Sequence, residues 1–161
     1  MTKLSEIITP QRIACNLQLG SKKRVLECIG DMIASSDSGL LPTEIFDSLI
    51  ARERLGSTGI GHGVAIPHGR LENIDVATCA FVSLEEGIDF DAVDRQPVNL
   101  VLALVVPVES TEEHLQLLAQ LAEMFSDEDL RQHLRDAKSS EEIYDLLIHW
   151  QPPRLRRTAA T

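Results

Sequence analysis

Apolar residues recur at helical spacing in the first third of the chain. Ser21 is placed to cap a helix from Lys22 to about Ser35, and Pro42 stands in the first turn of a second helix that ends near Leu55 and Gly56. The apolar faces consist of Val25, Leu26, Ile29, Met32 and Ile33 in the first helix and of Ile45, Phe46, Leu49 and Ile50 in the second. The pattern therefore predicts two amphipathic helices, each with one buried side.

The pattern changes from helical to extended in the middle of the chain. Val76 to Leu84 mixes β-branched, aromatic and small residues without a helical stripe. Val98 to Val106 is almost continuously apolar, as is typical of an interior strand that is covered on both faces. The region between them, Glu85 to Pro97, is acidic and rich in turn-forming residues. Two strands and an intervening loop are therefore predicted.

Amphipathic helices are predicted again after the apolar strand. Ser110 and Glu113 form a capping-box pattern, in which the hydroxyl and the carboxylate each bind a free backbone amide. The apolar face behind it consists of Leu117, Leu118, Leu121, Met124 and Phe125. A further helix spans about Asp127 to Ala137, and a last one runs from Ser139 or Ser140 to Trp150, before Pro152 and Pro153 end it.

Helices on either side of a strand-rich middle are typical of a layered α/β architecture. We therefore predict a single α/β domain over residues 1–151, with a mixed β-sheet and helices on both of its faces. No internal repeat or long linker divides this range. Residues 152–161 are predicted to be a flexible basic C-terminal tail.

Composition limits the protein's environment and its partners. The longest apolar run, Leu100 to Val108, is well short of the roughly 20 residues that a membrane-spanning helix needs. Met1 to Glu6 lacks the basic and apolar regions of a secretory signal, so we expect a cytoplasmic protein without membrane insertion. The formal net charge of -10 disfavours nucleic-acid binding and favours association with a basic protein partner.

A cluster of glycines is the most informative feature of the sequence. Gly56, Gly59, Gly61, Gly63 and Gly69 surround a short apolar piece, which predicts a tight loop and strand where the backbone comes close to another group. His68 lies between Pro67, which we expect to end a strand, and Gly69, which we expect to turn sharply and leave the ring unobstructed. A neutral imidazole has one nucleophilic nitrogen, while its other nitrogen can donate to a carbonyl that fixes the tautomer. His68 is therefore a candidate phosphoryl carrier.

The segments Gly-Ser-Thr-Gly-Ile-Gly (residues 56–61) and Ile-Pro-His-Gly (residues 66–69) resemble the signature of a known family. They are similar to enzyme IIA domains of the mannitol/fructose/nitrogen-related class of the phosphotransferase system, and the first segment resembles the nitrogen-related branch. The resemblance covers roughly Leu4 to Trp150. It implies that His68 accepts a phosphoryl group from a phosphohistidine on a small HPr/NPr-like carrier protein. It also implies that the phosphorylation state regulates partner proteins of nitrogen, potassium or carbon metabolism.

The resemblance adds two supporting residues. It matches Arg52 to the arginine of the family's Arg-Glu-x-Leu segment and His114 to a histidine that opens the helix after the apolar strand. Phosphoryl transfer needs positive or hydrogen-bonding groups around the equatorial oxygens, which an arginine fork supplies in fixed geometry. His114 falls one turn into the helix predicted at Ser110, where the helix dipole favours an anion. Both residues are expected to stabilise the phosphate.

Other polar residues of the motif are weaker candidates. His62 stands where relatives often have asparagine, and we assign it no catalytic role. Arg54 and Arg70 are interpreted as solvated charges, although either could reach the phosphate or a partner. Turn formation is the simplest role of Ser57 and Thr58. His133 and His149, on the late helices, are expected to be exposed.

Metal, cofactor and nucleotide chemistry find little support in the sequence. Cys15, Cys28 and Cys79 are odd in number and widely spaced, so we expect buried apolar thiols rather than disulfides or a thiolate zinc site. His62, His68 and His114 could converge, but no His-Glu-x-x-His or paired Cys-His spacing accompanies them. No Walker loop ends in Gly-Lys-Ser/Thr, so ATP is not expected as the direct donor. We expect neither a metal nor a cofactor.

Three functions remain open at this stage. The first is a phosphocarrier that regulates other proteins, acting as a carrier rather than as an enzyme that turns over a small molecule. The second is a sugar-transport IIA component that passes phosphate to a IIB partner, and the third is a non-catalytic binding module. The set of His68, Arg52 and His114 disfavours the third, and the family resemblance favours the first.

Overall fold

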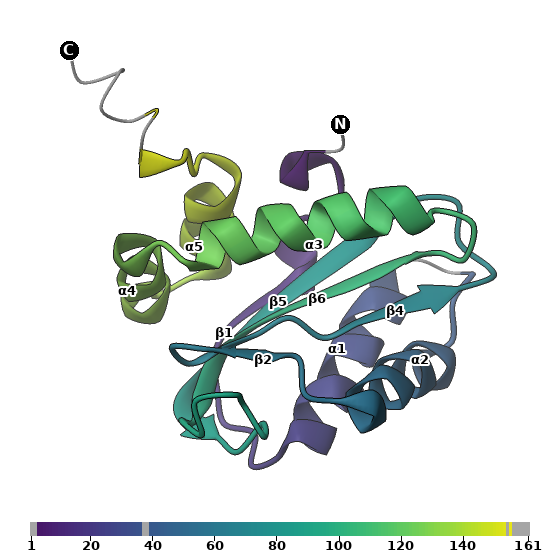
Figure 1. Cartoon of the computed structure of the whole chain (residues 1–161), viewed down its shortest axis with the longest axis horizontal. Coiled ribbons are helices and arrows are strands. Elements are labelled where there is room, and N and C mark those ends of the chain that lie inside the picture. Colours follow the sequence, from purple (N-terminus) through teal and green to yellow (C-terminus); the bar gives the residue numbers. More distant parts are fainter. Residues whose placement is uncertain (1–2, 37–38, 154, 156–161) are drawn as a thin grey trace.

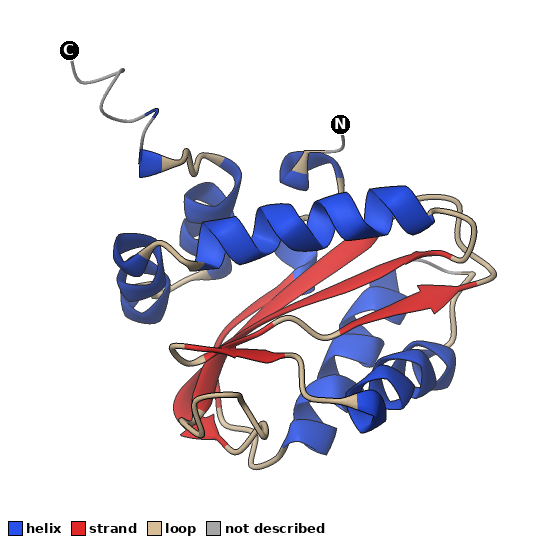
Figure 2. Ribbon diagram, viewed as in Figure 1, coloured by secondary structure: helices blue, strands red, loops and turns tan. Residues whose placement is uncertain are grey.

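A computed structural model describes residues 3–36, 39–153 and 155 of the chain. The strands are β1 (Ile13–Leu17), β2 (Gly59–Gly61), β3 (Val64–Ala65), β4 (His68–Leu71), β5 (Thr78–Ile88) and β6 (Val98–Pro107). The helices are α1 (Lys22–Ser36), α2 (Pro42–Leu55), α3 (Thr111–Phe125), α4 (Glu128–Asp136) and α5 (Ser140–Ile148), with short 3-10 helices at Leu4–Glu6 and Pro10–Arg12. The strands form one mixed sheet with helices on both faces, which confirms the predicted fold class (Figure 1; Figure 2).

The sheet is built around β6. Its strand order is β1-β5-β6-β3-β2, and β4 also pairs with β6. β6 runs antiparallel to β5 and parallel to β3 and β4, so it lies in the interior as its apolar sequence predicted. β1 pairs in parallel with β5 at one edge. The sequence analysis assigned no element to β1, because its five residues show no clear pattern and its pairing partner lies far along the chain.

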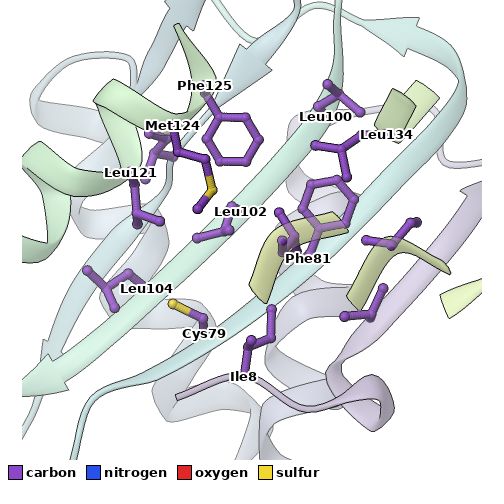
Figure 3. Packing of buried hydrophobic residues seen from close by; sticks show 14 of the residues in the cluster. Ile8, Cys79, Phe81, Leu100, Leu102, Leu104, Leu121, Met124, Phe125 and Leu134 are labelled. Carbon is purple, nitrogen blue, oxygen red and sulfur yellow. The ribbon is translucent and has the colours of Figure 1, made fainter. Parts of the chain in front are cut away.

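Alternate residues of β6 face the two helical layers, because side chains of a strand alternate between its faces. Leu100, Leu102 and Leu104 pack in a cluster with Phe81 of β5 and with α3, including Leu121, Met124 and Phe125 (Figure 3). Val101, Ala103 and Val105 belong to a second cluster that contains Val25 and Ile29 of α1 and Ile45 and Leu49 of α2. A residue paired with β6 therefore faces the same layer as its partner.

β3 and β4 lie along the same side of β6 in one continuous register, in which His68 is opposite Leu104. They are separated because Pro67 has no amide proton and because the amide of Ile66 donates to the carbonyl of Thr58 at 3.0 Å. The carbonyl of Pro67 still accepts from the amide of Leu104 at 2.9 Å. The prediction that Pro67 ends a strand is confirmed, and His68 opens the next one.

The predicted helices agree closely with the observed ones, but one predicted cap is wrong. The hydroxyls of Ser21 and Ser139 accept from the amides of Arg24 and Glu142, as expected for N-caps. The side chain of Ser110 makes no cap hydrogen bond, because its backbone (φ −92°, ψ 51°) is not in the extended conformation that N-caps adopt. The helix nevertheless begins there. β5 also extends to Ile88, into the region predicted to be turns.

The remaining sequence expectations have mixed outcomes. Cys79 is buried as predicted, whereas Cys15 and Cys28 are only half-buried, since β1 is an edge strand and Cys28 lies at the margin of the apolar face of α1. None of the helices that the structure describes is long and apolar enough to span a membrane. Most of the predicted C-terminal tail, namely residue 154 and residues 156–161, lies outside the described residues.

Candidate functional site

Two histidine rings, far apart in the sequence, meet beside the edge of the sheet. Their centroids lie 5.1 Å apart, and their planes are inclined by 76°. His68 lies opposite Leu104, which faces the α3 layer, so its ring is directed to the same layer. His114 belongs to the first turn of α3, which follows β6 after a short turn, and it is only 6% exposed. The fold therefore brings the predicted pair together.

The backbone fixes the tautomer of His68. Its Nδ1 lies 2.9 Å from the carbonyl oxygen of Ile66, and a carbonyl can only accept, so Nδ1 carries the proton. Nε2 is then left with its lone pair. Burial lowers the pKa of His68, and the charges of Arg52 and Arg70 lower it further, while the Ile66 carbonyl and Glu53 oppose this effect. His68 is therefore a neutral, nucleophilic imidazole at neutral pH.

His114 presents the complementary arrangement. Burial lowers its pKa to about 4, and the neighbouring charges of His68, Arg70 and Arg52 contribute in the same direction. Its Nδ1 accepts a hydrogen bond from Nε of Arg70 at 3.4 Å, which places the ring proton on Nε2. In the part of the chain that the structure describes, this buried Nε2 has no hydrogen-bond partner. An unused donor of this kind costs about 1–3 kcal/mol, so it points to an acceptor that binds there.

Arg52 lies at the end of α2 and contributes positive charge to both histidines. Its Nη1 donates to the carbonyl of Gly56 at 2.7 Å, which closes the C-terminus of the helix. Its charge lowers the pKa of His68 and of His114. The structure thus places the three predicted site residues, Arg52, His68 and His114, in one region.

The sequence analysis missed Glu53, the neighbour of Arg52. Glu53 is 6% exposed and accepts hydrogen bonds from Lys22 Nζ at 3.0 Å, from the Thr58 amide at 3.2 Å and from the Thr58 hydroxyl. These bonds connect the glycine-rich segment of residues 56–63, called the glycine loop below, to α1 and α2. A signal was present, because Glu53 follows the buried Leu49 by four residues and so continues the buried face of α2.

The glycine loop makes the close approaches that the sequence predicted. A Cβ at Gly59 would lie 2.8 Å from Cβ of Ala92, and one at Gly63 would lie 3.2 Å from Oδ1 of Asn99. His62 is exposed and has a left-handed backbone (φ 58°), a conformation that is uncommon for residues other than glycine, asparagine and aspartate.

Hydroxyl groups stabilise the same loop. The hydroxyl of Ser57 donates to the carbonyl of Phe90 at 2.6 Å and accepts from the amide of Gly59 at 3.0 Å. The expected turn-forming role of Ser57 is confirmed. Thr58 is fixed by Glu53 in a similar way, through both its amide and its hydroxyl.

The expectation that Gly69 forms a sharp turn is wrong. Gly69 continues β4, opposite Val105, and therefore faces α2. A Cβ at this position would collide with the side chain of Ser48 on α2. Glycine is needed here because α2 packs closely on the strand, and this close packing brings α2 near the site.

Arg70 is the second functional residue that the sequence analysis undervalued. It is exposed, as a solvated charge would be, but its Nε contacts His114. The signal was the alternation of a strand, because Arg70 follows His68 by two residues and so shares its face. Arg54, His133 and His149 are exposed, as expected.

The described residues include no group of three His, Cys, Asp or Glu side chains that could hold a metal ion. The site instead combines a neutral imidazole with a free nitrogen, a buried N–H without an acceptor, and the guanidinium group of Arg52, while Arg70 is bonded to the buried histidine. Such a set suits a nucleophile flanked by donors to an oxyanion.

Comparisons with known proteins identify relatives over almost the whole chain. The family described as "Phosphoenolpyruvate-dependent sugar phosphotransferase system, EIIA 2" matches residues 6–150. A nitrogen regulatory protein of Pseudomonas aeruginosa is 44% identical over 151 residues, which cover 94% of this chain and 98% of that protein. One of Escherichia coli K12 is 42% identical over 146 residues, covering 90% of this chain and 89% of that protein.

The fold agrees with that of a solved relative. The crystal structure of the nitrogen regulatory protein IIA-Ntr from Neisseria meningitidis superposes with a TM-score of 0.84 at 42% identity, covering 89% of this chain and 98% of that one. The chain therefore belongs to the EIIA 2 family of the phosphoenolpyruvate-dependent sugar phosphotransferase system, and within that family it is similar to the nitrogen regulatory proteins.

Proposed function

We propose that this protein is a regulatory phosphocarrier, which accepts a phosphoryl group on Nε2 of His68 and controls partner proteins through its phosphorylation state. The observation that carries this proposal is the complementary tautomers of the two histidines. His68 has a free nitrogen lone pair, because Ile66 binds the proton on Nδ1. His114 has a buried N–H without a partner beside it. A phosphoryl group on His68 supplies the acceptor that this N–H lacks.

The transfer is a displacement between two imidazole rings. The lone pair of His68 Nε2 attacks phosphorus as the bond from phosphorus to the donor's ring nitrogen breaks, and the donor ring keeps that electron pair. No proton has to leave His68 for this step, because its proton is on Nδ1, which donates to Ile66. Arg52 and His114 stabilise the negative charge on the transferring oxygens.

The donor is a phosphohistidine on a small carrier protein of the HPr/NPr kind. A net charge of -10 attracts a partner with a basic surface and steers its approach. Regulation rather than sugar transport is favoured by the relatives of similar length that are named nitrogen regulatory proteins. The alternative, a IIA component that passes phosphate to a IIB partner, remains the second candidate because the family description names a sugar system.

The test is labelling with phosphoenolpyruvate, enzyme I and the small carrier. Wild type should become labelled, and the label should be lost in acid and retained in base, as a phosphoramidate requires. His68→Ala should stay unlabelled, whereas His133→Ala, an exposed histidine of α4, should be labelled like wild type. Undiminished labelling of His68→Ala would refute the assignment.

A further inference from the structure

Arg70 is close to the site but is not one of the three residues expected to act on the phosphoryl group. It lies two residues after His68 on β4, opposite Val106, which faces the α3 layer. The hydroxyl of Ser48 on α2 donates to the carbonyl of Arg70 at 3.0 Å. The backbone of Arg70 is thus held by β6 on one side and by α2 on the other, although its side chain is exposed.

The contact of Arg70 with His114 has only one possible direction. A guanidinium group has donors and no acceptor, so Nδ1 of His114 must accept from Arg70 Nε through its lone pair. A neutral imidazole that accepts at Nδ1 carries its proton at Nε2. This is the buried nitrogen of His114 that lacks a partner within the described structure.

The opposite tautomer of His114, with its proton on Nδ1, would disfavour phosphoryl transfer. With its proton on Nδ1, His114 would present the lone pair of Nε2 to the phosphoryl oxygens, and two electron-rich groups repel each other. The neighbouring positive charge of Arg70 also disfavours protonation of the whole ring, in the same direction as its burial. Only the tautomer that accepts from Arg70 offers a donor next to His68.

We propose that Arg70 is a positioning residue that fixes His114 as its Nε2–H tautomer and so directs this donor to the phosphoryl group. The inference rests on the proposed function of His68 as the acceptor. It assigns Arg70 an effect through His114 rather than a direct effect on phosphorus. It also explains why an exposed arginine is bonded to a buried histidine.

Nitrogen-15 NMR of the histidine rings in the full chain reads the tautomer directly. In the unphosphorylated wild type, His114 should show a proton on Nε2 and an unprotonated Nδ1. In Arg70→Glu the carboxylate can only accept, so the proton should move to Nδ1. Arg54→Glu makes the same change of charge at an exposed position of α2 and should leave the His114 spectrum as in wild type. A proton on Nδ1 in wild type, or an unchanged tautomer in Arg70→Glu, would overturn the inference.

Rates of His68 labelling supply the functional readout. Arg70→Glu should slow single-turnover labelling by about a hundredfold, the usual loss for one charge-stabilising donor, while Arg70→Lys can still donate to Nδ1 and should stay within about tenfold of wild type. The slowing caused by Arg70→Met should disappear in a His114→Ala background. Equal slowing by Arg70→Met in both backgrounds would mean that Arg70 acts on the phosphoryl group itself and would refute the positioning role.

The two proposals fail in different ways. If His68→Ala is still labelled, the proposed acceptor is wrong, but the NMR spectrum still decides whether Arg70 fixes the tautomer. If His68 is the acceptor and the spectrum of Arg70→Glu is unchanged, only the role of Arg70 fails. Should Arg70→Glu not fold, Arg70→Met removes the donor without adding charge. If His114 in Arg70→Met has its proton on Nε2 as completely as in wild type, the inference is wrong.

Discussion

The buried, neutral state of His114 predicts a specific loss of stability in mild acid. Its pKa falls from its ordinary value of 6.5 to about 4, mainly because the ring is only 6% exposed. The unfolded chain therefore binds a proton on this residue between about pH 6.5 and pH 4, whereas the folded protein does not. The stability present above pH 6.5 is lost as the pH falls toward 4, and the total loss is about 3 kcal/mol, because each pKa unit is worth about 1.4 kcal/mol.

The variant His114→Gln isolates this contribution, because glutamine is neutral at every pH in this range. Between about pH 7 and about pH 5 the free energy of unfolding of wild type should fall by about 2 kcal/mol more than that of His114→Gln. Urea unfolding followed by circular dichroism at each pH measures both proteins. His133→Gln, which replaces an exposed histidine, should follow wild type.

If the free energy of unfolding depends on pH in the same way in wild type and in His114→Gln, the reasoning is refuted. This result would mean that His114 binds its proton equally well in both states and is accessible to water in the folded protein. The donor that we assign to its Nε2 would then lose its physical basis, since water could satisfy it. A larger loss in His114→Gln than in wild type would contradict the sign of the effect.

Three further predictions follow from the site. Arg52→Ala and His114→Ala should each slow single-turnover labelling of His68 by about a hundredfold yet still reach completion, and rates equal to wild type for both would show that the pocket is misplaced. The free energy of unfolding of Gly69→Ala, measured with urea, should be about 1–3 kcal/mol lower than that of wild type because its Cβ meets Ser48. That of Gly20→Ala should be unchanged, because the space around a Cβ at this position is open. Phosphorylation should release at least one partner that docks over His68, since burying the added charge is costly; equal capture by wild type, His68→Ala and phosphorylated protein would favour a plain relay.

The rim of such a docking surface differs from the one that the sequence suggests. As apolar residues of the two motif segments, Ile60 and Ile66 are expected from the sequence to rim the site, but Ile66 is only 4% exposed and belongs to the core beneath α3. Ile60 is 41% exposed. Because Ile66 is buried in the core, only Ile60 of this pair can contribute to an apolar rim.

The sequence by itself determined most of the elements and identified His68 as the candidate chemical centre. Helical spacing predicted α1 and α2 almost to the residue, and the uninterrupted apolar run predicted β6 as an interior strand. These signals are local, since each depends on residues within one element. Pro67 gives a local signal of the same kind, because its missing amide proton interrupts the strand, although the bond from the Ile66 amide to the Thr58 carbonyl also contributes to the separation of β3 from β4.

Only the tertiary structure decided how the site is assembled. Arg70 and His114 are 44 residues apart, and their contact depends on which face of β4 meets the first turn of α3. Gly69 could be interpreted as a turn from the sequence, because only the packing of α2 on β4 shows that the missing side chain makes room for Ser48. The role of Glu53 also depends on the tertiary structure, because its hydrogen bonds come from Lys22 and Thr58 outside its own helix. Burial and tautomer depend on neighbours that are distant in the sequence, so no local pattern contains them.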